Sequence, residues 1–145
     1  MNDNPVTETT MTTATAPHAL IEELRSLRER VMGVSESAVS TADGLLVAAD
    51  TATTQPESLA ALSAAALGLG KRTAQEVGIG GIRDVTTHCN AGYAVVLAIG
   101  EQALLVVLGD EGMDLAALRR ETPAVIQRLA ALLDVRLPAA EPGRV

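Results

Sequence analysis

The residues that could carry out chemistry are few, and their spacing does not assemble a catalytic group. His88 and Cys89 are the one adjacent pair that suggests metal or thiol chemistry, but neighbouring residues of a strand point to opposite faces. A zinc site would also need two further ligands at suitable spacing, and none stands out. We therefore predict that Cys89 is a small core residue and that His88 lies on the surface. We expect a protein that is not an enzyme and holds no metal or cofactor.

Two other motifs suggest chemistry, but the first lacks the required spacing and the second lies in an expected turn. The segment Gly68-Leu69-Gly70-Lys71-Arg72 superficially resembles a phosphate-binding loop. That loop needs a glycine five positions before the Gly-Lys pair and a Ser or Thr after the lysine. Here these positions hold Ala65 and Arg72. The neighbouring carboxylates of Asp110 and Glu111 fall in an expected turn, so we interpret them as solvated.

The composition excludes several classes of partner. The 145 residues include no Trp, no Phe and one Tyr, and 18 acidic against 11 basic residues give a formal net charge of −7. Binding of nucleic acid rests on aromatic stacking and on cations that neutralise phosphates, so we expect no nucleic-acid partner. With one Cys, no secretory signal and no apolar run near 20 residues, we predict a cytoplasmic protein without a transmembrane segment. Recruitment to a membrane by a partner stays open.

The chain divides into one domain and two tails. Residues 1–17 are Thr-rich with little to bury, and we predict that they are disordered, as are residues 137–145. Residues 18–136 form the folded domain. Within it, Asp43-Gly44 between two extended runs predicts a type I′ hairpin, Asp114 is the expected cap of the last helix, and Pro123 should kink or restart that helix. The expected helices are 18–32, 56–77 and one from 113 onward; the expected strands are 34–41, 45–49, 82–90, 93–99 and 103–108.

These elements predict an α/β fold of the α+β type. The order is α-β-β-α-β-β-β-α, and short hairpins make the five-stranded sheet mostly antiparallel. Strands 93–99 and 103–108 are apolar on both faces, so they should lie centrally and be covered on both sides. This gives a three-layer α-β-α architecture, with helix 56–77 on one face and the other two helices on the opposite face.

The remaining signals concern association. Helix 56–77 carries an unusual number of small residues, and strand 82–90 looks like a sheet edge that invites pairing. Two copies that meet through this strand would place their small-residue helices side by side across a twofold axis. The alternative is that the residues of this helix are small only because the helix lies close to its own sheet. The predicted dimer interface comprises Ala61, Ala64, Ala65, Gly68, Arg83, Val85 and Thr87.

Taken in order, several stretches resemble the roadblock family, named for a dynein light chain. They are Gly33-Val34, Ser40-Thr41-Ala42-Asp43-Gly44-Leu45-Leu46-Val47-Ala48, the Ala-rich 59–72, Gly92-Tyr93-Ala94-Val95-Val96 and Ala103-Leu104-Leu105-Val106-Val107-Leu108-Gly109. The resemblance covers about residues 20–133. It implies a profilin/roadblock-like fold and a dimer through the second helix and third strand. Ser35-Glu36-Ser37 departs from the smaller, more apolar residues common in relatives, which marks the surface beside the Asp-Gly turn as a place where this chain could differ.

The resemblance also implies a function. Family members regulate or scaffold small Ras-like GTPases, and bacterial single-domain members include activators that add no catalytic residue. Because the Arg and Ala content fits a GC-rich genome, the resemblance to actinobacterial relatives adds a sensor-kinase-like protein as a further expected partner. We expect a non-catalytic homodimer that binds such a GTPase through Lys71, Arg72 and Gln75. A small-ligand sensor and an adaptor that heterodimerises with another roadblock chain remain alternatives.

Overall fold

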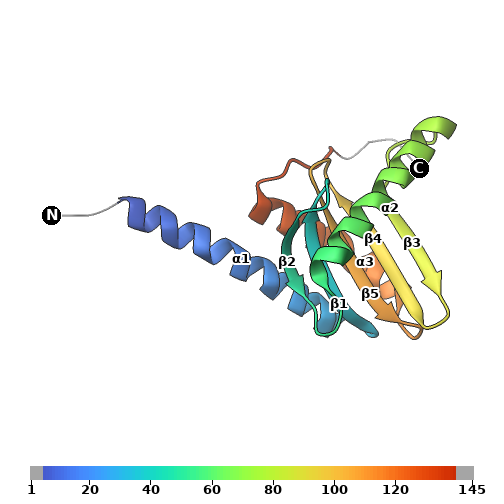
Figure 1. The fold of residues 1–145 in the computed structure, drawn as a ribbon, viewed down its shortest axis with the longest axis horizontal. Helices are drawn as coiled ribbons and strands as arrows, with labels where there is room; N and C mark the ends of the chain where they lie inside the picture. The colour runs from blue at the N-terminus through green and yellow to red at the C-terminus, as the bar shows by residue number, and fades with distance from the viewer. Residues whose placement is uncertain (1–4, 140–145) are drawn as a thin grey trace.

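A computed structural model describes residues 5–139 of the chain, and its side chains from residue 17 onward (Figure 1). The element order is the predicted one. The helices are α1 (Pro5–Arg30), α2 (Pro56–Val77) and α3 (Leu115–Leu133); the strands are β1 (Val34–Thr41), β2 (Leu46–Asp50), β3 (Asp84–Cys89), β4 (Gly92–Ile99) and β5 (Ala103–Asp110).

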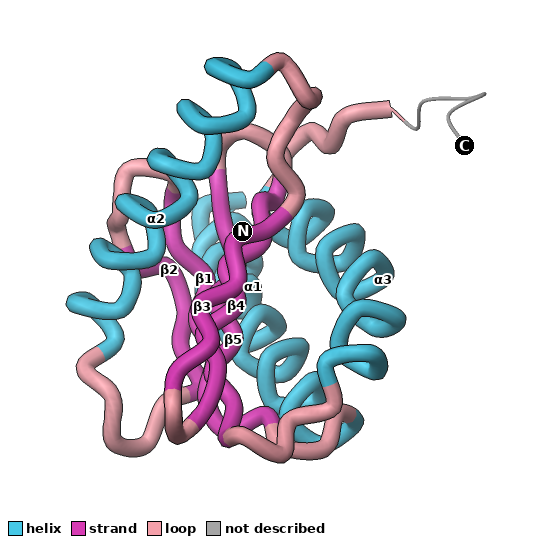
Figure 2. Tube along the Cα trace, turned by 90° about the vertical axis from the view of Figure 1, so that its right-hand side faces the viewer, coloured by secondary structure: helices cyan, strands magenta, loops and turns pink. Residues whose placement is uncertain are grey.

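The five strands form one antiparallel sheet in the order β2-β1-β5-β4-β3. Figure 2 shows α2 on one face and α1 and α3 on the other, so the predicted three-layer architecture is confirmed. β5 lies in the middle with β4 beside it, and β3 lies at an edge, as the sequence predicts.

The core is built outward from β5. Four successive residues of this strand, 104–107, have no exposed surface. Leu105 and Val107 pack under α1 and α3, whereas Leu104 and Val106 pack under α2. Because successive side chains of a strand point to opposite faces, this alternation requires cover on both sides.

On the larger side of the core, α1 contributes a continuous apolar stripe. Leu20, Leu24, Leu27 and Val31 recur at spacings of three and four and are all buried. Two ion pairs join α1 to α3: Arg30 to Glu121 and Arg128 to Glu23, both at 2.9 Å. These pairs are partly exposed and contribute little free energy, so the apolar stripe holds the two helices together.

The structure describes part of each predicted tail. α1 begins at Pro5, so most of the segment expected to be disordered is helical and projects beyond the sheet (Figure 1). Proline suits the first turn of a helix, where its missing N–H costs nothing, and the packed part of α1 gives the helix a nucleus to extend from. Leu137, assigned to the second tail, packs against the core. Residues 1–4 and 140–145 lie outside the described residues, and the domain boundaries stay a prediction.

The hairpin between β1 and β2 is not the predicted type I′ turn. That turn needs positive φ at both central residues, but only Gly44 has it, at +95°. The turn spans 41–44, with the Gly44 N–H donating to the Thr41 carbonyl at 3.0 Å. The Thr41 side chain explains why this turn replaces the type I′ turn. Its hydroxyl donates to the Asp43 carboxylate at 2.5 Å and accepts a hydrogen bond from the Leu45 N–H at 3.0 Å.

α3 runs without a restart through Pro123 to Leu133. Thus the helix absorbs the loss of one backbone hydrogen bond at the proline, and the expected restart does not occur. Its predicted cap is confirmed, since the Asp114 carboxylate accepts the Ala117 N–H at 2.9 Å. The predicted bounds of α2 are confirmed too: Pro56 occupies the first turn and Gly78 ends the helix with φ +67°.

Glu36 is a buried charge that anchors the loop between β2 and α2. Its side chain is 8% exposed, and it accepts hydrogen bonds from the N–H groups of Ala52, Thr53 and Thr54 at 2.5–3.2 Å. The Thr54 hydroxyl donates a fourth bond at 2.5 Å. Glu36 lies at the end of β1 away from the Asp43-Gly44 turn, so the expectation that this departure changes the surface beside that turn is wrong.

These donors stabilise the ionised form and lower the pKa of Glu36 to about 2, with the Thr54 hydroxyl contributing most and burial opposing the shift. The folded-state pKa is therefore below the ordinary 4.5. The stabilisation is present above about pH 4.5 and is lost as the pH falls toward about 2.

We expect Glu36→Gln to lower the free energy of unfolding at pH 7 by on the order of 3 kcal/mol, since one unit of pKa shift corresponds to about 1.4 kcal/mol. Urea denaturation between pH 7 and pH 2 measures this difference. The gap between variant and wild type should close as the medium becomes acidic. The matched control Glu111→Gln changes an exposed carboxylate and should shift stability by less than about 0.5 kcal/mol. A gap that does not depend on pH would contradict the assignment.

A second prediction concerns the effect of a side chain at Gly33 on stability. It has φ +88°, and a Cβ at this position would lie 2.3 Å from the Cα of Met113. Gly33→Ala should therefore destabilise the fold by about 2 kcal/mol or more, because the obstacle is backbone and the φ is strained. Gly81→Ala is the matched control, since nothing lies within 4 Å of its Cβ position. Equal unfolding midpoints for the two variants in urea would contradict the packing described for Gly33.

Candidate functional site

Part of the small-residue content of α2 is explained by its own sheet. Ala60, Ser63 and Leu67 are buried beneath the helix. A Cβ on Gly70 would lie 2.3 Å from the Ile82 side chain and 2.9 Å from Val85. The inner face of α2 therefore fits the alternative in which its residues are small because the helix lies close to its own sheet. That alternative does not apply to the outer face.

The structure does not bring the predicted dimer interface together on one side. Ala61 and Ala64 lie against Gly44 of the β1–β2 hairpin, where a Cβ on Gly44 would be 3.3 Å and 3.5 Å from them. Ala61 and Gly70 are nine residues apart, so at about 100° per residue they point to opposite flanks of α2. β3 lies on the Gly70 flank. Of the predicted set, Ala64 and Val85 are half-buried, while Ala61, Ala65, Gly68, Arg83 and Thr87 are exposed.

An exposed apolar stripe runs along the outer face of α2. Leu62 is 70% exposed, Leu69 is 68% exposed and Val77 is 58% exposed. Seven residues separate Leu62 from Leu69, so the two side chains leave the helix on nearly the same side. In the sequence, the signal for this stripe is the large apolar residues among the alanines of the helix, and the predicted interface, which consists of small residues on this helix, does not include them. We call Leu62, Leu69 and Val77 the α2 stripe.

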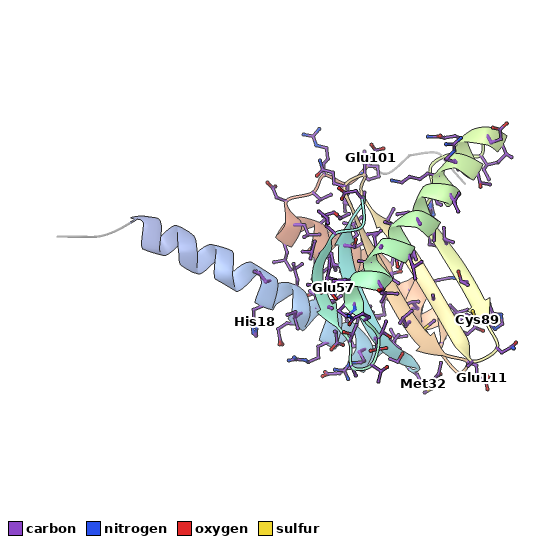
Figure 3. All side chains as sticks on the ribbon, viewed as in Figure 1. His18, Met32, Glu57, Cys89, Glu101 and Glu111 are labelled. Atoms are coloured by element: carbon purple, nitrogen blue, oxygen red, sulfur yellow. The ribbon has the colours of Figure 1, made fainter. Side chains whose placement is uncertain are left out.

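β3 is an edge strand whose far end is uncovered. In Figure 1, α2 crosses the sheet diagonally and reaches β3 near the residue where that strand begins. Cys89, at the opposite end (Figure 3), is exposed, so the expectation of a core cysteine is wrong: its strand has no helix over that end. His88 is exposed as predicted, and its ring stacks on Tyr93 with centroids 4.3 Å apart.

A groove of about 730 Å³ lies at the end of α2, and Lys71 and Gln75 line it. Arg72 does not line this groove, since the next residue of a helix points about 100° away. Thus the structure brings two of the three predicted partner-binding residues together and separates the third. The other walls come from the α2–β3 loop, the β4–β5 turn and the segment after α3.

That last segment, residues 134–138, is the C-terminal strap. It begins where Asp134 ends α3 with φ +57°. Val135 and Leu137 pack against the core on the α1 and α3 side, whereas Arg136 lines the groove on the α2 side. The strap crosses the β4–β5 turn so closely that a Cβ on Gly100 would lie 2.4 Å from the Arg136 carbonyl oxygen. We refer to the resulting cleft as the strap groove.

The electrostatics of the strap groove differ from those of the whole chain. Lys71 and Arg136 form no ion pair within the described residues, where six such contacts involve other basic side chains. Glu101 also lines the groove and is exposed at the β4–β5 turn (Figure 3). Two cations against one carboxylate make this region basic in a chain of net charge −7.

Among the side chains that the structure describes, no three His, Cys, Asp or Glu residues gather closely enough to hold a metal ion. None of the described helices is long and apolar enough to span a bilayer.

Comparison with known proteins agrees with this geometry. The model of the Roadblock/LC7 domain matches residues 20–109. A Roadblock/LC7 domain from Streptomyces avermitilis is 22% identical, with a TM-score of 0.73 over 78% of this chain and 96% of that one. The gliding protein MglB from Thermus thermophilus is 19% identical, with a TM-score of 0.72 over 82% of this chain and 91% of its own.

MglB from Myxococcus xanthus is 16% identical, with a TM-score of 0.73 over 80% of this chain and 95% of that one. At these identities the neighbours establish the fold. None of the curated proteins compared with the chain matches it. Since the family model matches more than half of the chain, in the same α1-to-β5 region that forms the sheet, the protein belongs to the Roadblock/LC7 family.

Proposed function

We propose that this protein is a cytoplasmic, non-catalytic homodimer that regulates or recruits a small Ras-like GTPase. The observation that carries the proposal is the Roadblock/LC7 match over residues 20–109, because roadblock proteins act on such GTPases. A sensor-kinase-like protein is the further partner that the resemblance suggests.

The α2 stripe and the β3 edge support the homodimer. Leu62, Leu69 and Val77 expose a row of large apolar side chains on one helix, and an unpaired strand edge lies on the same flank as Val77. Burial of each such side chain is favourable by about 1.5–3 kcal/mol, and a twofold axis would pair each surface with itself. One solved neighbour is described as "MglB with tetrameric arrangement", which shows self-association in that relative.

We therefore place the centre of the proposed interface on the α2 stripe, together with Val85 and Thr87 of the β3 edge and with Arg83, which precedes this strand. Ala65 is exposed and points to within about 60° of Leu62, so it fits the border of the stripe. Gly68 is exposed too, but it leaves the helix on nearly the same side as Ala61 and lies farther from the stripe. Ala61 and Ala64 lie toward the hairpin and are the least central of the predicted set.

The dimer makes a direct prediction. The double variant Leu62→Glu/Leu69→Glu should sediment as a single chain of 14.9 kDa at micromolar concentration, while the wild type sediments at twice that mass. Charges buried at an apolar contact would have no partner there. Leu45→Glu is the control: it adds the same charge at a residue that is 65% exposed on the hairpin, and it should remain dimeric. A monomeric wild type, or a dimeric double variant, would overturn the proposal.

Lys71, Arg72 and Gln75 are the proposed GTPase contacts. Arg72 is exposed beside the α2 stripe, and Lys71 and Gln75 lie at the strap groove, so a partner that touches all three must cover the C-terminal half of α2. An activator of this kind raises the hydrolysis rate by ordering the catalytic groups of the GTPase itself, in contrast to an arginine finger supplied in trans.

Affinity capture from the source cell should retain a Ras-like GTPase. With that GTPase purified, Lys71→Glu/Arg72→Glu should weaken binding at least tenfold, since two charge-assisted contacts become repulsive. Arg25→Glu/Arg120→Glu reverses two exposed charges on the other helices and should leave affinity unchanged. A faster GTP hydrolysis upon addition of the protein indicates activation, and an unchanged rate indicates recruitment. Capture without a Ras-like GTPase, or equal affinities for the two double variants, would contradict the proposal.

Two alternatives have their own readouts. Capture of a second roadblock chain in one-to-one amounts would favour a heterodimeric adaptor. A metabolite that raises the unfolding temperature of the purified protein would favour a small-ligand sensor, for which the strap groove offers a cavity.

A further inference from the structure

We infer that the strap groove is a docking site for a short acidic peptide segment of a partner, bound in an extended conformation. The inference stands apart from the GTPase proposal, because it rests on the walls and charges of the groove and not on the identity of the partner.

The first support is the wall formed by Gly80 and Gly81. These residues present backbone without side chains to the groove, and nothing lies within 4 Å of their Cβ positions. Within the described residues, neither glycine makes a backbone hydrogen bond. Their N–H and C=O groups are therefore free to form main-chain hydrogen bonds with a bound peptide.

The second support is charge. Lys71 of α2 and Arg136 of the strap both line the groove, and neither has an ion-pair partner among the described residues. Glu101 of the β4–β5 turn also lines it, so the lining carries two cations and one carboxylate. A peptide carboxylate beside either cation would gain a charge-assisted hydrogen bond. Gln75 and Gln102 add amide donors around the same space. A basic peptide would lose this complementarity and would meet two like charges.

The third support is the apolar part of the lining. Ile82, Ala98 and Leu137 line the groove and are only partly buried in the single chain. Because side chains of an extended peptide alternate in direction, a segment with alternating acidic and apolar residues fits both surfaces. A drug-sized molecule is enclosed over most of its surface in its pocket, whereas this groove is open along one side, which favours a chain that continues beyond it.

The groove also depends on a part of the chain that the family match does not include. Roadblock/LC7 similarity covers residues 20–109, whereas the wall that holds Arg136 lies in the strap. The Arg136 wall of the inferred site therefore lies outside the residues that the family model matches.

The test uses the full-length protein labelled with ¹⁵N and a synthetic hexapeptide of alternating Asp and Leu. Nuclear magnetic resonance titration should give saturable shifts for the amides of Gly80, Gly81 and Gly100. A peptide with Asn in place of Asp should bind at least tenfold more weakly. Lys71→Ala/Arg136→Ala should also weaken binding at least tenfold with an unchanged unfolding temperature, since neither side chain is in an ion pair. The control Arg25→Ala/Arg120→Ala removes the same charge elsewhere and should bind like the wild type.

Four outcomes would overturn the inference. They are no saturation up to millimolar peptide, shifts that map away from the strap groove, equal binding of the Asn and Asp peptides, and equal loss of binding in the two double variants. Because no GTPase is present, failure here leaves the proposed function intact, and failure to capture a GTPase leaves this result intact.

Discussion

The rest of the structure depends on the burial of β5 on both of its faces. Residues 104–107 are fully buried, two of them under α1 and α3 and two under α2. A sheet whose central strand is apolar on both sides must be covered on both sides, so the three layers follow from this strand. The absence of Phe and Trp fits the same constraint, since Leu, Val and Ala fill the thin spaces between close layers. α2 comes close enough for Gly70 to lie directly on Ile82 and Val85.

Elements with periodic patterns and strong end signals could be predicted from sequence. The bounds of α2 are correct because Pro56 and Gly78 mark its ends, and β1 is correct because Gly33 and the Asp43-Gly44 turn bound it. The turn type was not predictable, because it depends on the Thr41 hydroxyl, a contact that propensities do not include. The exposure of Cys89 depends on the diagonal path of α2 across the sheet, and no local pattern encodes that path.

The candidate site was predictable only in part, for similar reasons. Lys71 and Gln75 could be singled out because basic and amide side chains are scarce near the small-residue helix, and the structure places both at one groove. Arg72 was grouped with them by sequence proximity, but adjacent helical residues diverge. Arg136 could not be found from sequence, because it reaches the groove only through the path of the strap around the β4–β5 turn. Small size predicts the helical part of the dimer interface and the edge strand predicts the rest, whereas exposure singles out the α2 stripe.

The strap joins two faces of the sheet that otherwise share only the strands. Val135 and Leu137 hold it in the α1 and α3 core, and Arg136 forms a wall on the α2 side. If the strap detaches, the wall disappears, so the groove exists only in the population of molecules whose strap is docked. Occupancy of the groove and docking of the strap are therefore reciprocally linked, and each must favour the other by the same free energy. Apparent affinity then scales with the docked fraction, which makes the packing of α3 a determinant of binding on the opposite side of the sheet.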